Sequence, residues 1–161
     1  MQPTITTLPP IRVVGLCENS TFASHNPAAL WQRFMPRRHE IQQRVGDDYF
    51  AIRVFSSQIF TPDTSFEHWA AVAVSDDQEA PAGMQAHTLT GGEYAVFEHR
   101  GAPAALGQTL QHIFSDWLPQ SGYQLDQREH FERMPADYRP DDPQALETVW
   151  IPVRRNEPPA A

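Results

Sequence analysis

The order of strand and helix patterns constrains the fold most, because the same order occurs twice along the chain. In the first series, the strand pattern at Ile11–Cys17 is followed by a helix pattern over residues 27–45, which Pro36 should divide. Alternating apolar residues then predict two strands, at Tyr49–Phe55 and Phe66–Val74. The first half of the chain therefore has the order βαββ.

The second series repeats this order, with strand patterns at Glu93–His99, Glu129–Met134 and Glu147–Val153. Its helix, over residues 103–118, has the clearest amphipathic pattern in the chain. The apolar residues that recur there at helical spacing are Leu106, Leu110, Ile113, Phe114 and Trp117.

Short sequence matches support a duplication. Residues 27–32 (PAALWQ) align with residues 103–108 (PAALGQ), and Phe66-Glu67 aligns with Leu146-Glu147. Because proline-led helix starts of this composition are common, a chance match is the alternative. We expect one α+β domain over residues 1–161, made of tandem pseudo-twofold βαββ repeats (about 9–76 and 84–154). Its sheets should be antiparallel, with two main helices and a ligand cleft between the halves.

The charge balance restricts the possible partners. Twelve Lys and Arg residues against twenty Asp and Glu give a net charge of −8, which argues against direct binding of nucleic acid and against docking on anionic lipid. Cys17 is the single cysteine, so no internal disulfide can form. No signal peptide and no apolar run of about 20 residues is visible, so we expect a cytoplasmic protein.

Two glutamates are candidate binding residues. Glu147 should share a strand face with Val149 and Ile151, where a desolvated carboxylate would favour a cationic partner. Glu67 should share a face with Trp69 in the same way. The alternative for both is a solvated side chain near the start of a strand.

Aromatic residues make up 11% of the chain and could stack on a ligand, although most aromatic side chains belong to a core. No His or Cys spacing typical of a metal site, no nucleophile motif and no glycine-rich cofactor loop is present, so we expect neither metal nor cofactor. The aromatic candidates on predicted elements are Trp31, Tyr49, Trp69, Trp117 and Trp150.

The second half resembles a known bacterial family, the GyrI-like effector-binding domains. Residues 93–101 (EYAVFEHRG) resemble the family's Tyr-Ala strand, and residues 113–123 (IFSDWLPQSGY) resemble its Trp-Leu-Pro helix end. His130–Met134 and Leu146–Val153 resemble its closing strands, which end in Glu-x-hydrophobic-aromatic-Ile-Pro-Val. The resemblance covers residues 84–153, whereas the first half matches only in element order.

The resemblance implies a small-molecule-binding module, of the type that senses drugs or effectors in bacterial transcription regulators. In such domains a glutamate on the last strand commonly meets amphipathic, cationic aromatic ligands, and Glu147 matches that position. Trp117 and Trp150 match family aromatic positions. Residues 1–10 are too short for a helix-turn-helix, so a stand-alone sensor is expected.

Two further functions are implied by stand-alone relatives of this family. One branch hydrolyses cyclopropane-bearing genotoxins, and the catalytic carboxylates here would then be Glu147 and Glu67. Another branch acts through protein interaction, as gyrase-inhibitor-like proteins do, which implies an unidentified protein partner. These alternatives remain open beside the binding module.

Overall fold

A computed structural model describes residues 2–57, 60–75, 79–102 and 105–156. The strands are β1 (Thr4–Leu8), β2 (Ile11–Thr21), β3 (Arg44–Phe55), β4 (Ser65–Val74), β5 (Gln85–Leu89), β6 (Gly92–Arg100), β7 (Tyr123–Leu125), β8 (His130–Met134) and β9 (Leu146–Arg155). The helical segments are α1 (Pro27–Phe34), the 3-10 helix η1 (Met35–Glu40), α2 (Leu106–His112), the π-helical η3 (Ile113–Trp117) and the 3-10 helix η4 (Leu118–Gln120).

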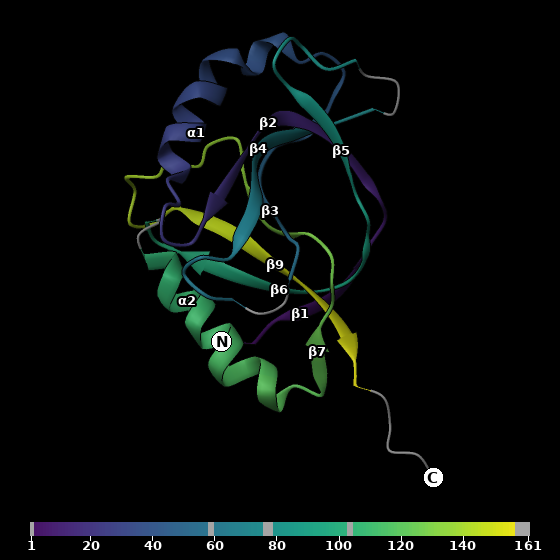
Figure 1. Ribbon diagram of the computed structural model, residues 1–161, viewed down its shortest axis with the longest axis vertical. Helices are drawn as coiled ribbons and strands as arrows, with labels where there is room; N and C mark the ends of the chain where they lie inside the picture. Colours follow the sequence, from purple (N-terminus) through teal and green to yellow (C-terminus); the bar gives the residue numbers. More distant parts are fainter. Residues whose placement is uncertain (1, 58–59, 76–78, 103–104, 157–161) are drawn as a thin grey trace.

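The strand order is symmetric about its centre. It runs β1-β6-β9-β8-β3-β4-β2-β5, with β7 added on β9, and every adjacent pair is antiparallel. In each half the last strand lies between the other two, and β3 pairs with β8 to join the halves (Figure 1). The predicted α+β fold with two βαββ units is confirmed.

Two short strands exchange between the halves. β1 precedes β2 in the chain but pairs with β6, whereas β5 precedes β6 but pairs with β2. The two connections pass so close together that a Cβ at Gly91 would lie 2.7 Å from the Leu8 carbonyl oxygen, and Gly91 has φ +84°. Glycine is required there for both reasons. The sheet that these strands complete is curled (Figure 1).

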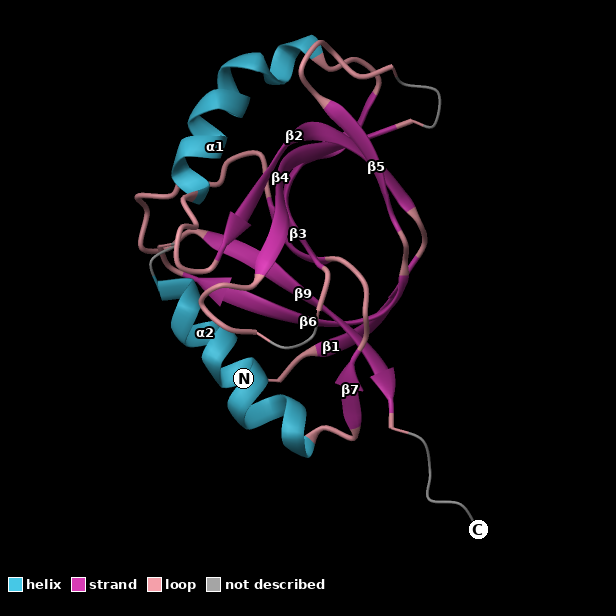
Figure 2. Ribbon diagram, in the orientation of Figure 1, coloured by secondary structure: helices cyan, strands magenta, loops and turns pink. Residues whose placement is uncertain are grey.

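The sheet has two faces with separate cores. Its helix face is covered by α1, through Leu30 and Phe34, and by the α2–η3 segment, through Ile113. Both helices lie on the same flank of the curled sheet (Figure 2). Its inner face, enclosed by the curl, holds the third core, which consists of Leu8, Val13, Phe50, Ile52, Trp69, Ala71, Ala73, Leu89, Tyr94, Phe131 and Trp150.

The helix boundaries differ from the sequence prediction. The first helix was expected over 27–45, but the α-helix ends at Phe34 and η1 ends at Glu40. Pro36 has no amide hydrogen to continue the α-helical ladder, so the break expected there is confirmed. Val45, the last residue of the predicted helix, instead belongs to β3 and is 60% exposed, so the predicted helix end was wrong.

The second helical segment continues past its predicted end at 118, through η4 to Gln120. The predicted start at Pro103 lies outside the described residues. Sequence reasoning missed β1, β5 and β7, which are short and lack an alternating apolar pattern of useful length. No helix in the described part of the chain is both long and apolar enough to cross a membrane.

Candidate functional site

The helix face is hollowed between α2 and the centre of the sheet. This cavity, of about 290 Å³, takes side chains from both halves of the domain. We call it the aromatic pocket, and its lining residues are Phe22, Arg53, Phe55, Phe60, Gly107, Leu110, Gln111, Phe114, His130 and Ile151. Its position between the halves is a usual place for a ligand site.

Aromatic rings pack around the mouth of this pocket. Phe22 stacks on Phe55 at 5.7 Å between ring centres, and Phe60 lies 4.9 Å from Phe55 and 6.3 Å from Phe114. Phe22 and Phe60 are 43% and 39% exposed although both are large and apolar. Exposed aromatic rings beside a concave surface are typical of a binding site.

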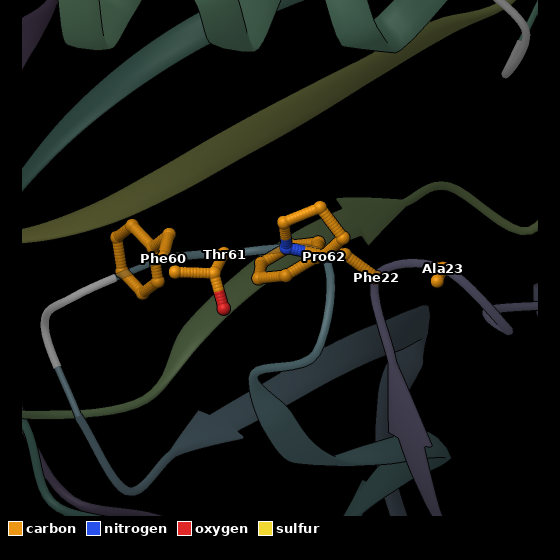
Figure 3. A pocket seen from close by; sticks show the side chains of 5 residues that line it. All are labelled: Phe22, Ala23, Phe60, Thr61 and Pro62. Carbon is orange, nitrogen blue, oxygen red and sulfur yellow. The ribbon is translucent and has the colours of Figure 1, made fainter.

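The same two rings line a second, outer cavity of about 380 Å³ (Figure 3). There Phe60 and Pro62, which precede β4, approach Phe22 and Ala23, which follow β2. A backbone hydrogen bond of 3.0 Å, from the Ala23 amide to the Pro62 carbonyl oxygen, ties the two segments together. Phe22 and Phe60 thus border both the outer cavity and the aromatic pocket.

The floor of the aromatic pocket is polar. Arg53 of β3 forms an ion pair with Glu132 of β8 across the junction of the two halves. Burial, and then the nearby Arg53, lower the pKa of His130 to about 3, and the same causes lower the pKa of His68 to about 3. Both imidazoles are therefore neutral at physiological pH, and Arg53 is the cation of the floor.

Glu147 lies on β9 beside this floor and is only 4% exposed. Desolvation, and then Glu132, raise the pKa of its carboxyl to about 7, against the opposing effects of Tyr138 and Arg53. The Tyr138 hydroxyl is close enough to act on this pKa, yet neither it nor Glu147 Oε1 completes a hydrogen bond of good geometry with a described residue. Such an unsatisfied buried carboxylate is unfavourable.

Two of the predicted aromatics lie in the neighbourhood of Glu147. Arg133 pairs with Thr148, so Met134 and Glu147, the next residues in register, face each other. Met134 in turn pairs with Tyr49, whose ring packs edge-on against Trp31 of α1 at 6.1 Å. Glu147, Tyr49 and Trp31 therefore share the helix face, although none of them lines the aromatic pocket or the outer cavity.

Glu67 and Trp69 share a face, as strand alternation predicted, but it is the inner face. The Trp69 indole N–H donates to Glu67 Oε1 at 3.1 Å, and Trp69 is buried in the inner core. Glu67 lies on the inner face and Glu147 on the helix face, and three strand spacings, roughly 14 Å, separate β4 from β9 in addition to an offset along the strands. The two carboxylates cannot act together on one small ligand.

The other two tryptophans belong to cores. Trp150 lies on the inner face, stacked on Phe131 at 5.3 Å. Trp117 packs against Phe97 and Tyr123 between η3 and the sheet. Neither lines the aromatic pocket or the outer cavity.

The register identifies which positions of the two halves are equivalent. Trp69 pairs with Ile52, Trp150 pairs with Phe131, and Ile52 pairs with Phe131 across the central junction. The Trp150 indole donates to Thr148 Oγ1 at 2.9 Å, as Trp69 donates to Glu67. Glu67 is therefore equivalent to Thr148, and Phe66 to Glu147, one residue away from the alignment expected from the sequence.

Sequence reasoning missed the central charges. Arg53 and Glu132 each interrupt the apolar residues of a buried strand, and charges of opposite sign on two such strands predict a pair when the strands are neighbours. That neighbourhood follows only from the β3–β8 pairing, which the sequence does not reveal. Tyr138 carried no signal, because it lies in the irregular β8–β9 connection.

Other reactive side chains offer no second site. Burial, with Glu67 beside it, raises the pKa of the Cys17 thiol to about 12, so it is a poor nucleophile. In the described ranges, no three His, Cys, Asp or Glu side chains are grouped so that they could hold a metal ion.

Comparison with known proteins agrees with this architecture. The chain is 28% identical over 154 residues to the transcriptional regulator BrlR of Pseudomonas aeruginosa strain PAO1. The match covers 95% of this chain but only 56% of BrlR, so the chain spans about half the length of that relative.

Solved structures with low sequence identity share the fold. SAV2435 bound to tetraphenylphosphonium is 18% identical with a TM-score of 0.70, and the match covers 96% of this chain and 94% of that one. A hydrolase from Listeria innocua, encoded by lin2189, is 13% identical with a TM-score of 0.60, over 95% and 92% of the two chains.

A family model, described as the GyrI-like small molecule binding domain, matches residues 1–154 and therefore almost the whole chain. The symmetric strand order and the cavity between the halves are the architecture that the resemblance predicted. This chain belongs to the GyrI-like small molecule binding domain family.

Proposed function

We propose that this domain binds amphipathic organic cations with aromatic groups on its helix face, with Glu147 as the counter-charge. The observation that carries the proposal is the buried Glu147 carboxyl, whose Oε1 has no hydrogen-bond partner among the described residues. A cation beside it would supply the compensating charge that a buried carboxylate needs.

The proposed orientation of the ligand follows from the distribution of charge. The aromatic groups enter the aromatic pocket, where Phe22, Phe60 and Phe114 offer stacking surfaces. Arg53 on the floor of the pocket repels a positive charge. The charge of the ligand therefore points away from Arg53 and toward Glu147, Tyr49 and Trp31.

Access to Glu147 requires a side-chain movement. Tyr138 lies close to the carboxyl, and the aromatic pocket extends along β9 only as far as Ile151. Displacement of Tyr138 uncovers the Glu147 carboxyl for a ligand that also occupies the pocket. Side-chain rearrangement of this kind is common on binding.

Two relatives support this proposal. SAV2435, which shares the fold, was solved with tetraphenylphosphonium, a monovalent cation that carries four phenyl groups. BrlR, which contains the same type of domain within a longer chain, is a transcriptional regulator. We propose that this chain performs the corresponding sensing step, in which a small molecule is detected, without direct contact with nucleic acid.

The test compares a cation with a neutral ligand of similar shape. Tetraphenylphosphonium and triphenylphosphine oxide are titrated calorimetrically into the wild type, into Glu147→Gln and into Glu98→Gln. Loss of the Coulomb attraction to Glu147 should weaken binding of the cation by about 1.5–3 kcal/mol, roughly 10–100-fold, with little effect on the neutral ligand.

Glu98→Gln is the matched control, because Glu98 is exposed on β6 and loses the same charge. It should change cation binding by less than about twofold, as a screened surface charge does. Equal affinity of the wild type and Glu147→Gln for the cation would contradict the role of Glu147 as counter-charge.

A second candidate function is hydrolysis, because a carboxyl with a pKa of about 7 can act as a general base or acid near neutral pH. The Listeria hydrolase shares the fold. Cyclopropane-bearing electrophiles, incubated with the protein and analysed by mass spectrometry, should then gain water. Glu147→Gln should slow this reaction by about 10²–10⁴-fold, and Glu67, on the opposite face, should have no part in it.

A further inference from the structure

Buried negative and positive charges are not balanced on the helix face beside the aromatic pocket. Glu132 and Glu147 are both almost fully buried, and they lie on neighbouring strands on the same face. Glu132 pairs with Val149, so Glu147 is its diagonal neighbour, roughly 7–8 Å away between Cα atoms. Arg53 is committed to Glu132, so two carboxylates share one guanidinium.

No other described charge near Glu147 balances the second carboxylate. On β6, His99 lies opposite Glu147, but its Nε2 donates to the Ala102 carbonyl oxygen and its Nδ1 lies 2.8 Å from the Thr109 hydroxyl. From the β8–β9 connection comes Tyr138, which is neutral because burial, and then Glu147, raise the pKa of its hydroxyl.

The helices supply no compensating cation either. Arg33 in the last turn of α1 is paired with Glu18 at 2.6 Å, and His112 in the last turn of α2 lies 3.1 Å from Asp116 Oδ2. Arg44, beyond Tyr49, lies over the Tyr49 ring rather than against a carboxylate. Among the described residues, Arg53 is the one cation that acts on Glu147 and it is paired with Glu132, so a proton or a cationic ligand is what can neutralise the second carboxylate.

We infer that the site takes up a monovalent organic cation in exchange for one proton from the Glu132–Glu147 pair, so that the buried charge does not change on binding. This inference rests on the proposed function. The carboxylic acid of Glu147 loses its proton to the buffer, the carboxylate remains, and the cation of the ligand becomes its counter-charge. One carboxylate is left for the ligand, so the site suits a single positive charge.

Proton exchange makes binding depend on pH in a defined direction. Burial and Glu132 raise the pKa of Glu147 to about 7 in the free protein, and a bound cation should lower it again. Below pH 7, each further fall of one pH unit should therefore weaken the binding of the cation about tenfold, because the proton competes with the ligand. Above pH 8 the affinity should be nearly constant.

The experiment counts protons by calorimetry. Tetraphenylphosphonium has no ionisable group, so any proton released on binding comes from the protein. Titration in two buffers with different heats of ionisation should show the number of protons released for each cation bound. It should be close to one at about pH 6, about half at pH 7 and almost zero at about pH 8.5. Glu98→Gln should behave as the wild type.

Each outcome decides the inference. Binding of the cation to the wild type without proton release at any of these pH values overturns the exchange but leaves the proposed function intact. Unchanged proton release in Glu147→Gln also overturns it, because another group is then the donor. Failure of the cation to bind at all removes both proposals together, and the wild-type measurement alone remains decisive if the variant does not fold.

Discussion

The two halves of the domain place opposite chemistry at equivalent positions. In the first half, Phe66 packs its ring 5.0 Å from Phe22 and 5.2 Å from Phe55, in an apolar cluster. In the second half, Glu147 occupies the equivalent position beside Glu132 and Tyr138. Both side chains are almost fully buried, at 3% and 4% exposure.

This difference teaches that the repeated fold supplies the shape of the site, whereas single residues supply its chemistry. The β3–β8 junction brings the two halves together symmetrically. The substitution of a carboxyl for a phenyl ring at one of two equivalent positions gives the helix face an apolar end and an acidic end. A site with two unlike ends can orient an amphipathic cation, which a fully symmetric site could not do.

The largest expected effect is the loss of stability when the apolar position, Phe66, is truncated. Phe66→Ala removes a buried ring from the apolar cluster and should lower the free energy of unfolding by about 3–5 kcal/mol. Urea denaturation followed by Trp fluorescence measures the change. Phe66→Leu, which retains most of the apolar volume, is the control and should lower it by clearly less. If Phe66→Ala left the free energy of unfolding nearly unchanged, the apolar end would not be packed as described.

The equivalent change in the second half should have the opposite sign. Glu147→Gln removes a desolvated acid and should raise the free energy of unfolding at about pH 8 by roughly 1–3 kcal/mol. The folded pKa is about 7, above the ordinary value of 4.5, so the folded state binds more protons than the unfolded state between these values.

The stability of the wild type relative to Glu147→Gln should consequently fall as pH rises through this window, and the penalty from Glu147 should be complete above pH 7. Below about pH 4.5 the wild type and Glu147→Gln should be nearly equal in stability. Denaturation curves over this pH range, with Glu98→Gln as the surface control, test the sign. A variant that is less stable than the wild type at pH 8 would mean that Glu147 is paired or solvated.

The fold was largely predictable from the sequence, because apolar periodicity and proline-led helix starts are local signals. The α+β order and the parity of Glu147 with Val149 and Ile151 follow from such signals, and the structure agrees. The exchange of β1 and β5 depends on long-range pairing of short strands and was missed for that reason.

The candidate site was less predictable, because its charges become neighbours only through the β3–β8 junction. A two-residue alignment made Glu67 equivalent to Glu147. The strand register instead makes Glu67 equivalent to Thr148 and places it on the inner face. Trp150 carried a family-like signal, yet it stacks within the inner core. Sequence parity assigns a side chain to one of two faces, and only packing determines which face carries the cavity.

The most direct test of the oriented site is to locate the charge of a bound cation. Tetraphenylarsonium resembles tetraphenylphosphonium and carries arsenic, whose anomalous scattering marks its position in a crystal of the complex. The arsenic should lie on the helix face within about 6 Å of the Glu147 carboxylate, with a phenyl group between Phe22, Phe60 and Phe114. An arsenic position beside Glu67 and Trp69 on the inner face, or one distant from both glutamates, would contradict the account.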